Sequence, residues 1–425
     1  MASLVTSKFR VHNAQQFAEA FSEASNTIMY LFIGKNTTFP NVNSPPTPVN
    51  STANIEYTPW RDMYAAKRIT TSDVTHAIER YDWTSGTVYD QYDDQDTDLL
   101  EDDFYVMTED YNVYKCLFNA GATASTTKPT GVSTSPFTTA DGYIWKYMYT
   151  VTTAKALKFL TNDYIPVQTL ASDDGTDQWD VQQAAVDGGI HVVKVTAGGS
   201  GYATAPAVTI TGDGTGATAN STITANVVTS VTITAAGTGY TRASVSFASG
   251  AATANAIISP QGGHGSDAVE ELGGKFIMLN VRLDGNESNT FSTANEFRQV
   301  GIVRDPYLYG TTTRAVASSF RQSFKYQLSS ISGTFTVDET ITSGSNTASL
   351  IEFTTPSIFT TLPLNLPFAN TATVTGGTSG ATGTIAAITT PGLKPYSGDI
   401  IYVENRVPIA RADDQIEDVK LVIQF

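Results

Sequence analysis

The chain has 425 residues, 41% of them hydrophobic, which is enough for two or three domains with substantial cores. Its formal net charge of −16 argues against nucleic acid as a partner, because binding phosphates requires a basic surface. The longest apolar run, residues 28–33, is far shorter than the roughly 20 residues of a membrane-spanning helix, so we expect no membrane insertion.

The N-terminal part of the chain predicts two helices, a strand and a loop. Asn13 is a suitable cap for a helix that places Phe17 and Phe21 on one face. No apolar stretch of a secretory signal follows the first residues, so we expect synthesis and use in a cytoplasm. Further along the chain the pattern predicts a strand over 27–33, a proline-rich extended loop over 36–59 and a helix around 72–78.

An acidic segment follows at residues 90–110. It holds ten carboxylates and no lysine or arginine: Asp90, Asp93, Asp94, Asp96, Asp98, Glu101, Asp102, Asp103, Glu109 and Asp110. A solvated loop, a docking surface for a basic partner and a weak calcium site are all compatible with this composition. An EF-hand is excluded, because Leu99 and Tyr105 occupy the positions that require glycine and a bidentate glutamate.

Apolar alternation predicts strands over 104–107, 112–117, 143–151, 275–281 and 299–303, and two more near the C-terminus. The only cysteine, Cys116, lies in the second of these and is interpreted as a core residue, with no disulfide possible inside one chain. In the third strand four aromatic residues alternate with other side chains and are expected to share a face: Tyr143, Trp145, Tyr147 and Tyr149. This face is either packed in the core or exposed as a subunit interface.

Two stretches are almost free of charge. Residues 195–258 contain only Asp213 and Arg242, and residues 329–393 contain only Asp338, Glu339 and Glu352. Each stretch repeats internally: Gly-Ser-Gly-Tyr at 199–202 returns as Gly-Thr-Gly-Tyr at 237–240, and the segment 342–348 returns at 375–381. Threonine, valine and glycine in such repeats predict two all-β modules with tight turns.

No pattern of catalytic or metal-ligating residues stands out. The four histidines, His12, His76, His191 and His264, lie far apart in the sequence, without ligand spacing. His264 is followed by Ser266 and Asp267, but neighbouring residues in a glycine-rich stretch cannot form a catalytic triad by themselves. We therefore expect a protein that is not an enzyme and has no catalytic residue, cofactor or metal site.

Six segments carry a resemblance to a known family. They are Val-Thr-Ser-Lys-Phe-Arg at 5–10, Arg80 with Asp82-Trp83 and Gly86, Asp-Gly-Tyr-Ile-Trp-Lys-Tyr at 141–147, Asn-Asp-Tyr-Ile at 162–165, Phe-Arg-Gln-Val-Gly-Ile at 297–302, and Tyr-Val-Glu-Asn-Arg at 402–406 with Pro408-Ile409 and Asp414-Gln415. In this order and wording the chain resembles the baseplate wedge protein, the gene 8 product, of T-even-type contractile-tailed bacteriophages.

The resemblance implies an α+β, β-dominated fold with a central β-sandwich flanked by α/β domains. It divides the chain into wedge framework at 1–186, 262–325 and 394–425, and two insertions without counterpart in the family, at 187–261 and 326–393. Arg298 and Arg406 lie in the best-matching segments and are interpreted as fold-determining, with Glu404 or Asp414 as candidate carboxylate partners.

By the same resemblance the chain is a structural subunit of the virion tail baseplate, assembled in the host cytoplasm. It implies a homodimer that connects other wedge proteins and helps to transmit the rearrangement that triggers sheath contraction. The alternative is a receptor-binding or tail-fibre-associated protein that contacts host surface glycans through the inserted modules.

Overall fold

The computed structural model describes residues 4–23, 27–365 and 367–425. Strands account for 42% of the residues and helices for 11%, so the expected β-dominated α+β class is confirmed. The chain forms two compact units. Unit 1 consists of the described residues before Phe17, together with Thr75–Met278 and Val422–Phe425, and unit 2 consists of Phe17–Val74 and Leu279–Leu421. No described helix is long and apolar enough to cross a bilayer.

The predictions for the N-terminal helix and the second helix need correction. Helix α1 spans Ser7–Glu19, so Asn13 lies inside it, and the hydroxyl of Thr6 accepts the Phe9 amide at the true start (3.3 Å). Instead of a helix, the segment around 72–78 forms a short 3-10 turn, Thr71–Asp73, and then strand β3 (Val74–Glu79). The cause is pairing: β3 gains an antiparallel partner in β8 (Tyr164–Val167), which outweighs local helix propensity.

The proline-rich segment contains regular structure that the sequence did not indicate. A π-helical turn (η1, Ala53–Tyr57) leads into the short helix α2 (Thr58–Asp62). Proline fits the first turn of α2, where its missing N–H costs nothing, and Trp60 from the same turn is 1% exposed in the core of unit 2. The predicted extended loop is therefore wrong in its last third.

Unit 1 contains one complete framework sheet and part of a second one, whose two longest strands have most of their residues in unit 2. One has the order β4-β5-β7-β6, with β4 at Tyr105–Met107, β5 at Asn112–Phe118, β6 at Phe137–Thr138 and β7 at Ile144–Thr150. The other has the order β25-β15-β3-β8, where β15 is Phe276–Asp284 and β25 is Ile416–Gln424. Three short helices, α3 (Thr153–Phe159), α4 (Asp177–Gln183) and α5 (Ala268–Glu271), connect these strands.

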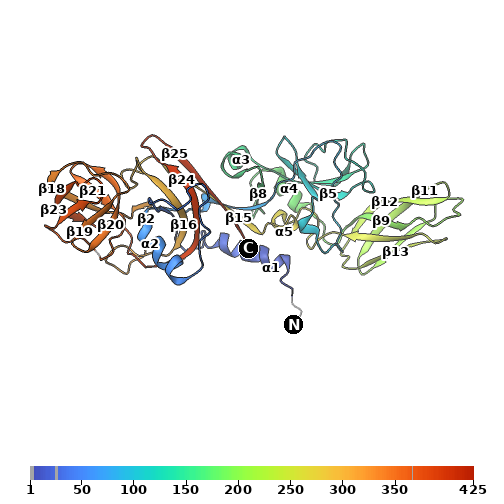
Figure 1. Ribbon diagram of the computed structural model, residues 1–425. Helices are drawn as coiled ribbons and strands as arrows, with labels where there is room; N and C mark the ends of the chain where they lie inside the picture. Colours follow the sequence, from blue (N-terminus) through green and yellow to red (C-terminus); the bar gives the residue numbers. More distant parts are fainter. Residues whose placement is uncertain (1–3, 24–26, 366) are drawn as a thin grey trace. The chain divides into compact units, whose positions relative to one another are not determined.

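The first uncharged stretch forms only strands: β9 (Ile190–Ala197), β10 (Val208–Gly212), β11 (Thr215–Thr224), β12 (Val227–Thr238), β13 (Ala243–Phe247) and β14 (Thr253–Ile258) (Figure 1). They make a four-stranded sheet, β11-β12-β9-β14, and a pair, β10-β13. The repeated Gly-Ser-Gly-Tyr and Gly-Thr-Gly-Tyr segments each supply a tyrosine to the interior of this module. Tyr202 and Tyr240 are both buried, and each hydroxyl accepts a backbone amide, from Ala252 (2.8 Å) and Ala217 (3.4 Å).

The second uncharged stretch is a closed six-stranded barrel in unit 2, orange in Figure 1. Its strands are β18 (Phe324–Ser332), β19 (Thr340–Ser343), β20 (Asn346–Thr354), β21 (Ser357–Thr360), β22 (Thr373–Gly376) and β23 (Thr382–Thr389). The repeated segments form two equivalent hairpins, β19-β20 and β22-β23, which pair with each other through β19 and β22. Closure leaves no free sheet edge for the module.

Unit 2 also contains a five-stranded sheet with the order β17-β2-β1-β16-β24. Its strands are β17 (Ser319–Arg321), β2 (Met63–Arg68), β1 (Met29–Gly34), β16 (Glu296–Arg304) and β24 (Asp399–Ala410). All six residues of β1 are buried, as a central strand covered on both faces requires. The two predicted C-terminal strands are confirmed, but they join different sheets: β24 pairs with β16, and β25 belongs to the sheet of β15.

Gly301 in the middle of β16 is expected to be intolerant of any side chain. A Cβ at this position would overlap the Phe32 ring and the Tyr402 carbonyl oxygen on the two neighbouring strands. We expect Gly301→Ala to lower the free energy of unfolding of unit 2 by about 1–3 kcal/mol, because overpacking must push strands or a ring aside. Chemical denaturation measures the change. The control is Gly377→Ala, whose new Cβ lies 3.1 Å from its nearest neighbour, the Thr340 oxygen; equal losses in both variants would contradict the prediction.

Candidate functional site

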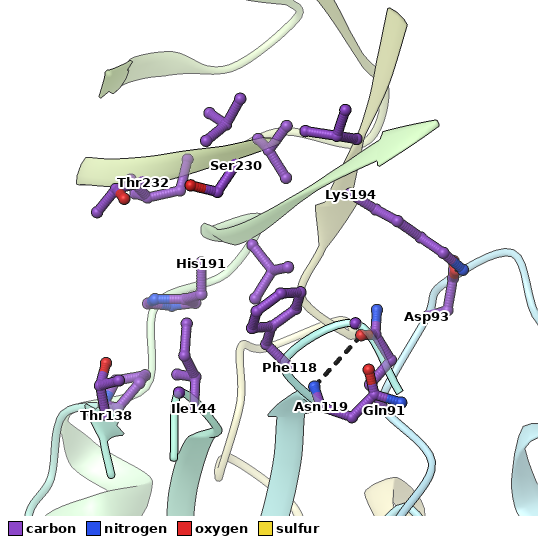
Figure 2. A pocket seen from close by; sticks show the side chains of 18 of the residues that line it. Gln91, Asp93, Phe118, Asn119, Thr138, Ile144, His191, Lys194, Ser230 and Thr232 are labelled. Atoms are coloured by element: carbon purple, nitrogen blue, oxygen red, sulfur yellow. Dashed lines mark hydrogen bonds and ion pairs between the residues drawn. The ribbon is translucent and has the colours of Figure 1, made fainter. Parts of the chain in front are cut away.

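Unit 1 contains a groove of about 930 Å³, which is in the size range of ligand pockets. Three parts of the chain line it (Figure 2). The acidic segment contributes Gln91 and Asp93, the ends of β5 and β7 contribute Phe118 and Ile144, and strands β9 and β12 form the opposite wall. The groove is therefore built where the first inserted module meets the framework of unit 1.

The acidic segment is held against this module by two contacts. The ammonium group of Lys194 in β9 lies 3.2 Å from a carboxylate oxygen of Asp93, and the amide of Ile258 in β14 donates to Asp94 (3.1 Å). Burial raises the pKa of Asp94, and the hydrogen bond from Ile258 opposes that shift. Part of the acidic segment thus attaches the module to the framework.

Other carboxylates of this segment also have partners inside the chain. Glu101 accepts from Lys275 (2.7 Å), and Glu109 accepts from Lys128 (2.7 Å). Among the residues that the structure describes, no group of three or more histidine, cysteine, aspartate or glutamate side chains is arranged to hold a metal ion. Most carboxylates of the segment are nevertheless exposed, as expected for a solvated loop, so the segment combines a solvated surface with these internal contacts.

Two lysines form a buried polar cluster in the framework sheet. Lys115 in β5 and Lys146 in β7 are directly opposite each other in the antiparallel ladder, and they are 0% and 2% exposed. Lys115 donates to the carboxylate of Glu271 (2.8 Å), and its ammonium group lies 4.1 Å from the centre of the Tyr92 ring. Lys146 donates instead to the carbonyl oxygen of Thr134 (2.5 Å). The buried carboxylate thus pairs with one of the two lysines, and a backbone carbonyl accepts from the other.

Burial dominates the protonation of this cluster. Desolvation lowers the pKa of Lys115, while Glu271 opposes the shift. Desolvation also lowers the pKa of Lys146 to about 8; Glu271 opposes this and Lys115 adds to it. Because the side chains of Lys115 and Glu271 are 0% and 2% exposed, the pair is placed to hold β5 against α5 and not to meet a ligand.

Two histidines that are far apart in the sequence come together beside this cluster. The His191 and His264 rings lie 5.6 Å apart, and His264 also packs edge-to-face on Tyr92 at 4.8 Å. His264 enters the core from a turn in which Gly263 and Gly265 both have positive φ. The fold thus brings together two histidines that are distant in the sequence, and the glycine-rich turn delivers a core residue, His264.

The pH dependence of stability should report on His191. Burial, and secondarily Lys146, lowers its pKa to about 4. The unfolded chain binds the proton near pH 6.5, so stability is complete above that pH and falls as the pH drops toward 4. We expect the loss of stability between pH 7.5 and 5, measured by urea denaturation, to be smaller in His191→Gln than in the wild type by on the order of 1–2 kcal/mol, while the buried His264, whose pKa is also lowered, contributes to the loss in both proteins. His12 is exposed, and His12→Gln should keep the wild-type slope; identical slopes in all three proteins would contradict the prediction.

The four aromatic residues, Tyr143 just before β7 and three within it, lie inside unit 1. Tyr143, Trp145, Tyr147 and Tyr149 are between 0% and 3% exposed, so the structure places them in the core and not on an exposed interface. They also do not share one face. The first three pack in one hydrophobic cluster and Tyr149 in another, because a bulge in the β5-β7 ladder shifts the register between Val113 and Tyr114.

The two framework arginines have different environments. Arg298 in β16 is 3% exposed and donates to the Asn36 carbonyl oxygen and to Glu296. Arg406 pairs with Glu404, two residues earlier on β24, at 2.9 Å, and both side chains are partly exposed. Asp414 lies in the link between β24 and β25 and is not the ionic partner of either arginine. Of these two arginines, only Arg298 is buried deeply enough for the packing of unit 2 to depend on it.

Comparison with known proteins adds no assignment. No protein-family model matches the chain, and no curated protein matches it. Inferences about its function therefore depend on the six family-like segments and on how the fold arranges them.

Proposed function

We propose that this chain is a structural subunit of a contractile phage tail baseplate wedge, acting as a dimeric connector between wedge proteins. The observation that carries the proposal is spatial: segments that resemble the wedge protein and lie far apart in the sequence contact one another within each unit. Such contacts are expected if the segments form a framework shared with that family.

In unit 1 the contacts centre on Arg80. Its guanidinium pairs with Asp82 (2.9 Å) and donates to the carbonyl oxygen of Thr161 (2.7 Å), and its amide donates to Asp163 of the fourth family-like segment. The second family-like segment thereby holds the residues that lead into β8 in place. These bonds use the charged side chain and the backbone together, as a structural framework requires.

The third family-like segment is tied to the second through a serine. The indole of Trp83 donates to the hydroxyl of Ser125 (3.1 Å), which in turn donates to Asp141 (3.1 Å). Burial alone would raise the pKa of Asp141, but hydrogen bonds from Thr139 and from the amides of residues 126 and 127 lower it to about 2. Asp141 is therefore a charged anchor that organises the loop before β7.

In unit 2 the last two family-like segments are adjacent strands. Residues 297–302 lie in β16 and residues 402–406 lie in β24, with Gly301 opposite Val403 and Gln299 opposite Asn405. The Gln299 side chain also donates to Asn405 (2.8 Å). The two segments that resemble the family most specifically thus form one strand pair and contact each other across it.

The mechanism that we propose is mechanical. Close-packed cores and fully bonded networks deform little, so each unit would move as a rigid body while its interfaces with wedge partners rearrange. The subunit would hold the baseplate in its state before attachment and pass on the rearrangement that releases sheath contraction. Assembly would take place in the host cytoplasm and the product would reside in the virion.

The test is the solution mass of the purified chain, followed by co-purification with the other wedge proteins of the same phage. We expect a dimer of twice 45.4 kDa by light scattering, and a stable complex with at least one wedge partner. A monomer or trimer that binds no wedge protein would overturn the proposal. Arg80→Ala, compared with Arg242→Ala, whose side chain is 85% exposed and lies outside the family-like segments, tests whether the contacts between those segments matter for that complex.

The groove of unit 1 favours a second candidate, a protein that contacts host surface glycans. Its lining combines hydroxyls of β12 such as Ser230 and Thr232 with the Gln91 and Asn119 amides and the Phe118 ring (Figure 2). Hydrogen-bonding groups around an aromatic ring suit a polyhydroxylated ligand. Glycan-array binding that Phe118→Ala removes, in a chain that forms no wedge complex, would favour this function over the first.

A further inference from the structure

A second pocket, of about 480 Å³, lies in unit 2 where the chain leaves β17 and enters the barrel at β18. Residues 286–293 and Asp413 line one side, and barrel residues from β20 and β21 line the other. Two cations, Arg321 at the end of β17 and Lys325 in β18, belong to its lining. The pocket belongs to neither the groove nor the family-like contacts described above.

Both cations lack the partners that cations have elsewhere in this chain. Arg321 and Lys325 make no hydrogen bond or ion pair through their side chains within the part of the chain that the structure describes, and the buried Nε of Arg321 is unsatisfied. With 41 carboxylates for 25 lysines and arginines, ionic partners are abundant in this protein. Leaving a partly buried guanidinium unpaired costs free energy, so its position calls for an anion.

A single ring holds the two cations near each other. The Arg321 guanidinium carbon lies 5.6 Å from the centre of the Phe359 ring, and the Lys325 ammonium group lies 5.4 Å from the same centre. Lys325 and Phe359 are direct partners in the β18-β21 ladder, which fixes the lysine over the ring. Two like charges converge here without a protein group between them to neutralise both.

Among the residues that the structure describes, neither carboxylate of the pocket forms an ion pair with Arg321 or Lys325. Glu352 accepts a hydrogen bond from the hydroxyl of Thr354 (2.8 Å), and Asp413 accepts from the hydroxyl of Thr293. Glu352 lies opposite Phe359 on the other side from Lys325, so the ring separates the two charges. Burial lowers the pKa of Arg321 and Glu352 opposes that shift, but an arginine stays protonated at any physiological pH.

We propose that this pocket binds an oxyanion, the phosphate or carboxylate group of a small ligand, through Arg321 and Lys325. Arginine presents its donors in a fork that matches two oxygens of either group, while lysine adds a point charge. The hydroxyl of Ser357, which lines the same pocket, is a further donor. Glu352 limits the site to ligands whose charge is compact, because it repels an anion that extends across Phe359.

Titration calorimetry of the full chain at low ionic strength tests the proposal with inorganic phosphate and with succinate as probes. We expect saturable binding of at least one probe, weakened about tenfold or more in Arg321→Gln and in Lys325→Gln, since each removes a charge-assisted contact. Lys394→Gln removes the same charge from an exposed position outside the pocket and should bind as the wild type does. Which probe binds more tightly identifies the group as phosphate or carboxylate.

Glu352→Gln should have the opposite effect on affinity, because removing the repulsion between Glu352 and the anion should tighten binding severalfold. This variant distinguishes a specific site from loss of folding, because a damaged barrel cannot bind better. If Arg321→Gln unfolds the chain, Lys325→Gln tests the proposal alone. The Lys325 side chain lies on the outer face of β18, so its replacement leaves the barrel core intact. Absence of saturable binding of both probes, or wild-type affinity in Lys325→Gln, would overturn the proposal.

Discussion

Replacing Lys115 by methionine is expected to destabilise unit 1 by about 3–5 kcal/mol, because it leaves the buried carboxylate of Glu271 without its cation. The pair is closed to solvent, with side chains 0% and 2% exposed and 2.8 Å between Nζ and Oε2. Methionine fills most of the volume, so the loss is electrostatic and not a cavity effect. It also removes the contact of the ammonium group with the Tyr92 ring at 4.1 Å.

The double variant Lys115→Met with Glu271→Gln should recover part of that loss. Glutamine removes the uncompensated charge, and its amide oxygen can still accept the backbone amides of Gly265 and Asp267 that Glu271 now accepts (2.7 and 3.2 Å). Urea denaturation followed by circular dichroism gives the free energies, and hydrogen exchange assigns the transition to unit 1. A double variant less stable than Lys115→Met would contradict the argument.

Lys194→Met is the matched control. Lys194 also pairs with a carboxylate, Asp93, at 3.2 Å, but its side chain is 50% exposed. Water screens such a pair, and we expect a change within about 0.5 kcal/mol. A loss equal to that of Lys115→Met would show that burial does not set the strength of these ion pairs.

The strand positions in this chain could be predicted from sequence because side-chain alternation reports burial directly. Strand β16, for example, contains all of the residues 299–303 that were expected to form a strand. The helix predicted around 72–78 was wrong because the helical signal is local, whereas the pairing of Ile78 with Ile165 depends on a residue far along the chain. Tertiary pairing decides between two states that the local sequence allows.

The sequence indicated the lysines of the buried cluster but not their carboxylate partner. Lys115 and Lys146 each interrupt an apolar strand pattern, and a lysine at such a position requires a buried partner. The identity of the partner could not be inferred, because Glu271 lies 156 residues from Lys115 and no spacing rule connects them. The same limit explains why the groove and the oxyanion pocket were missed, since both are formed by segments that only the fold brings together.

Trp145→Ala is expected to lower the stability of unit 1 by about 3–5 kcal/mol, because it empties a large volume in a close-packed core. Trp145 is fully buried; its ring stacks on Tyr143 with centroids 5.3 Å apart and meets Tyr89 edge-on at 6.1 Å. The residue thus links β7 to the loop that precedes the acidic segment. Denaturation combined with hydrogen exchange of peptides from unit 1 measures the loss.

The same variant tests the core assignment of this aromatic strand against the interface alternative. Because the indole nitrogen of Trp145 has no hydrogen-bond partner among the described residues, Trp145→Phe loses only volume and should cost less than about half as much as Trp145→Ala. Stability should therefore follow side-chain volume, while the mass of the folded protein in solution stays that of the wild type. A variant that kept its unfolding free energy but lost its oligomeric mass would place Trp145 at a subunit contact, and the arrangement of β7 described here would be wrong.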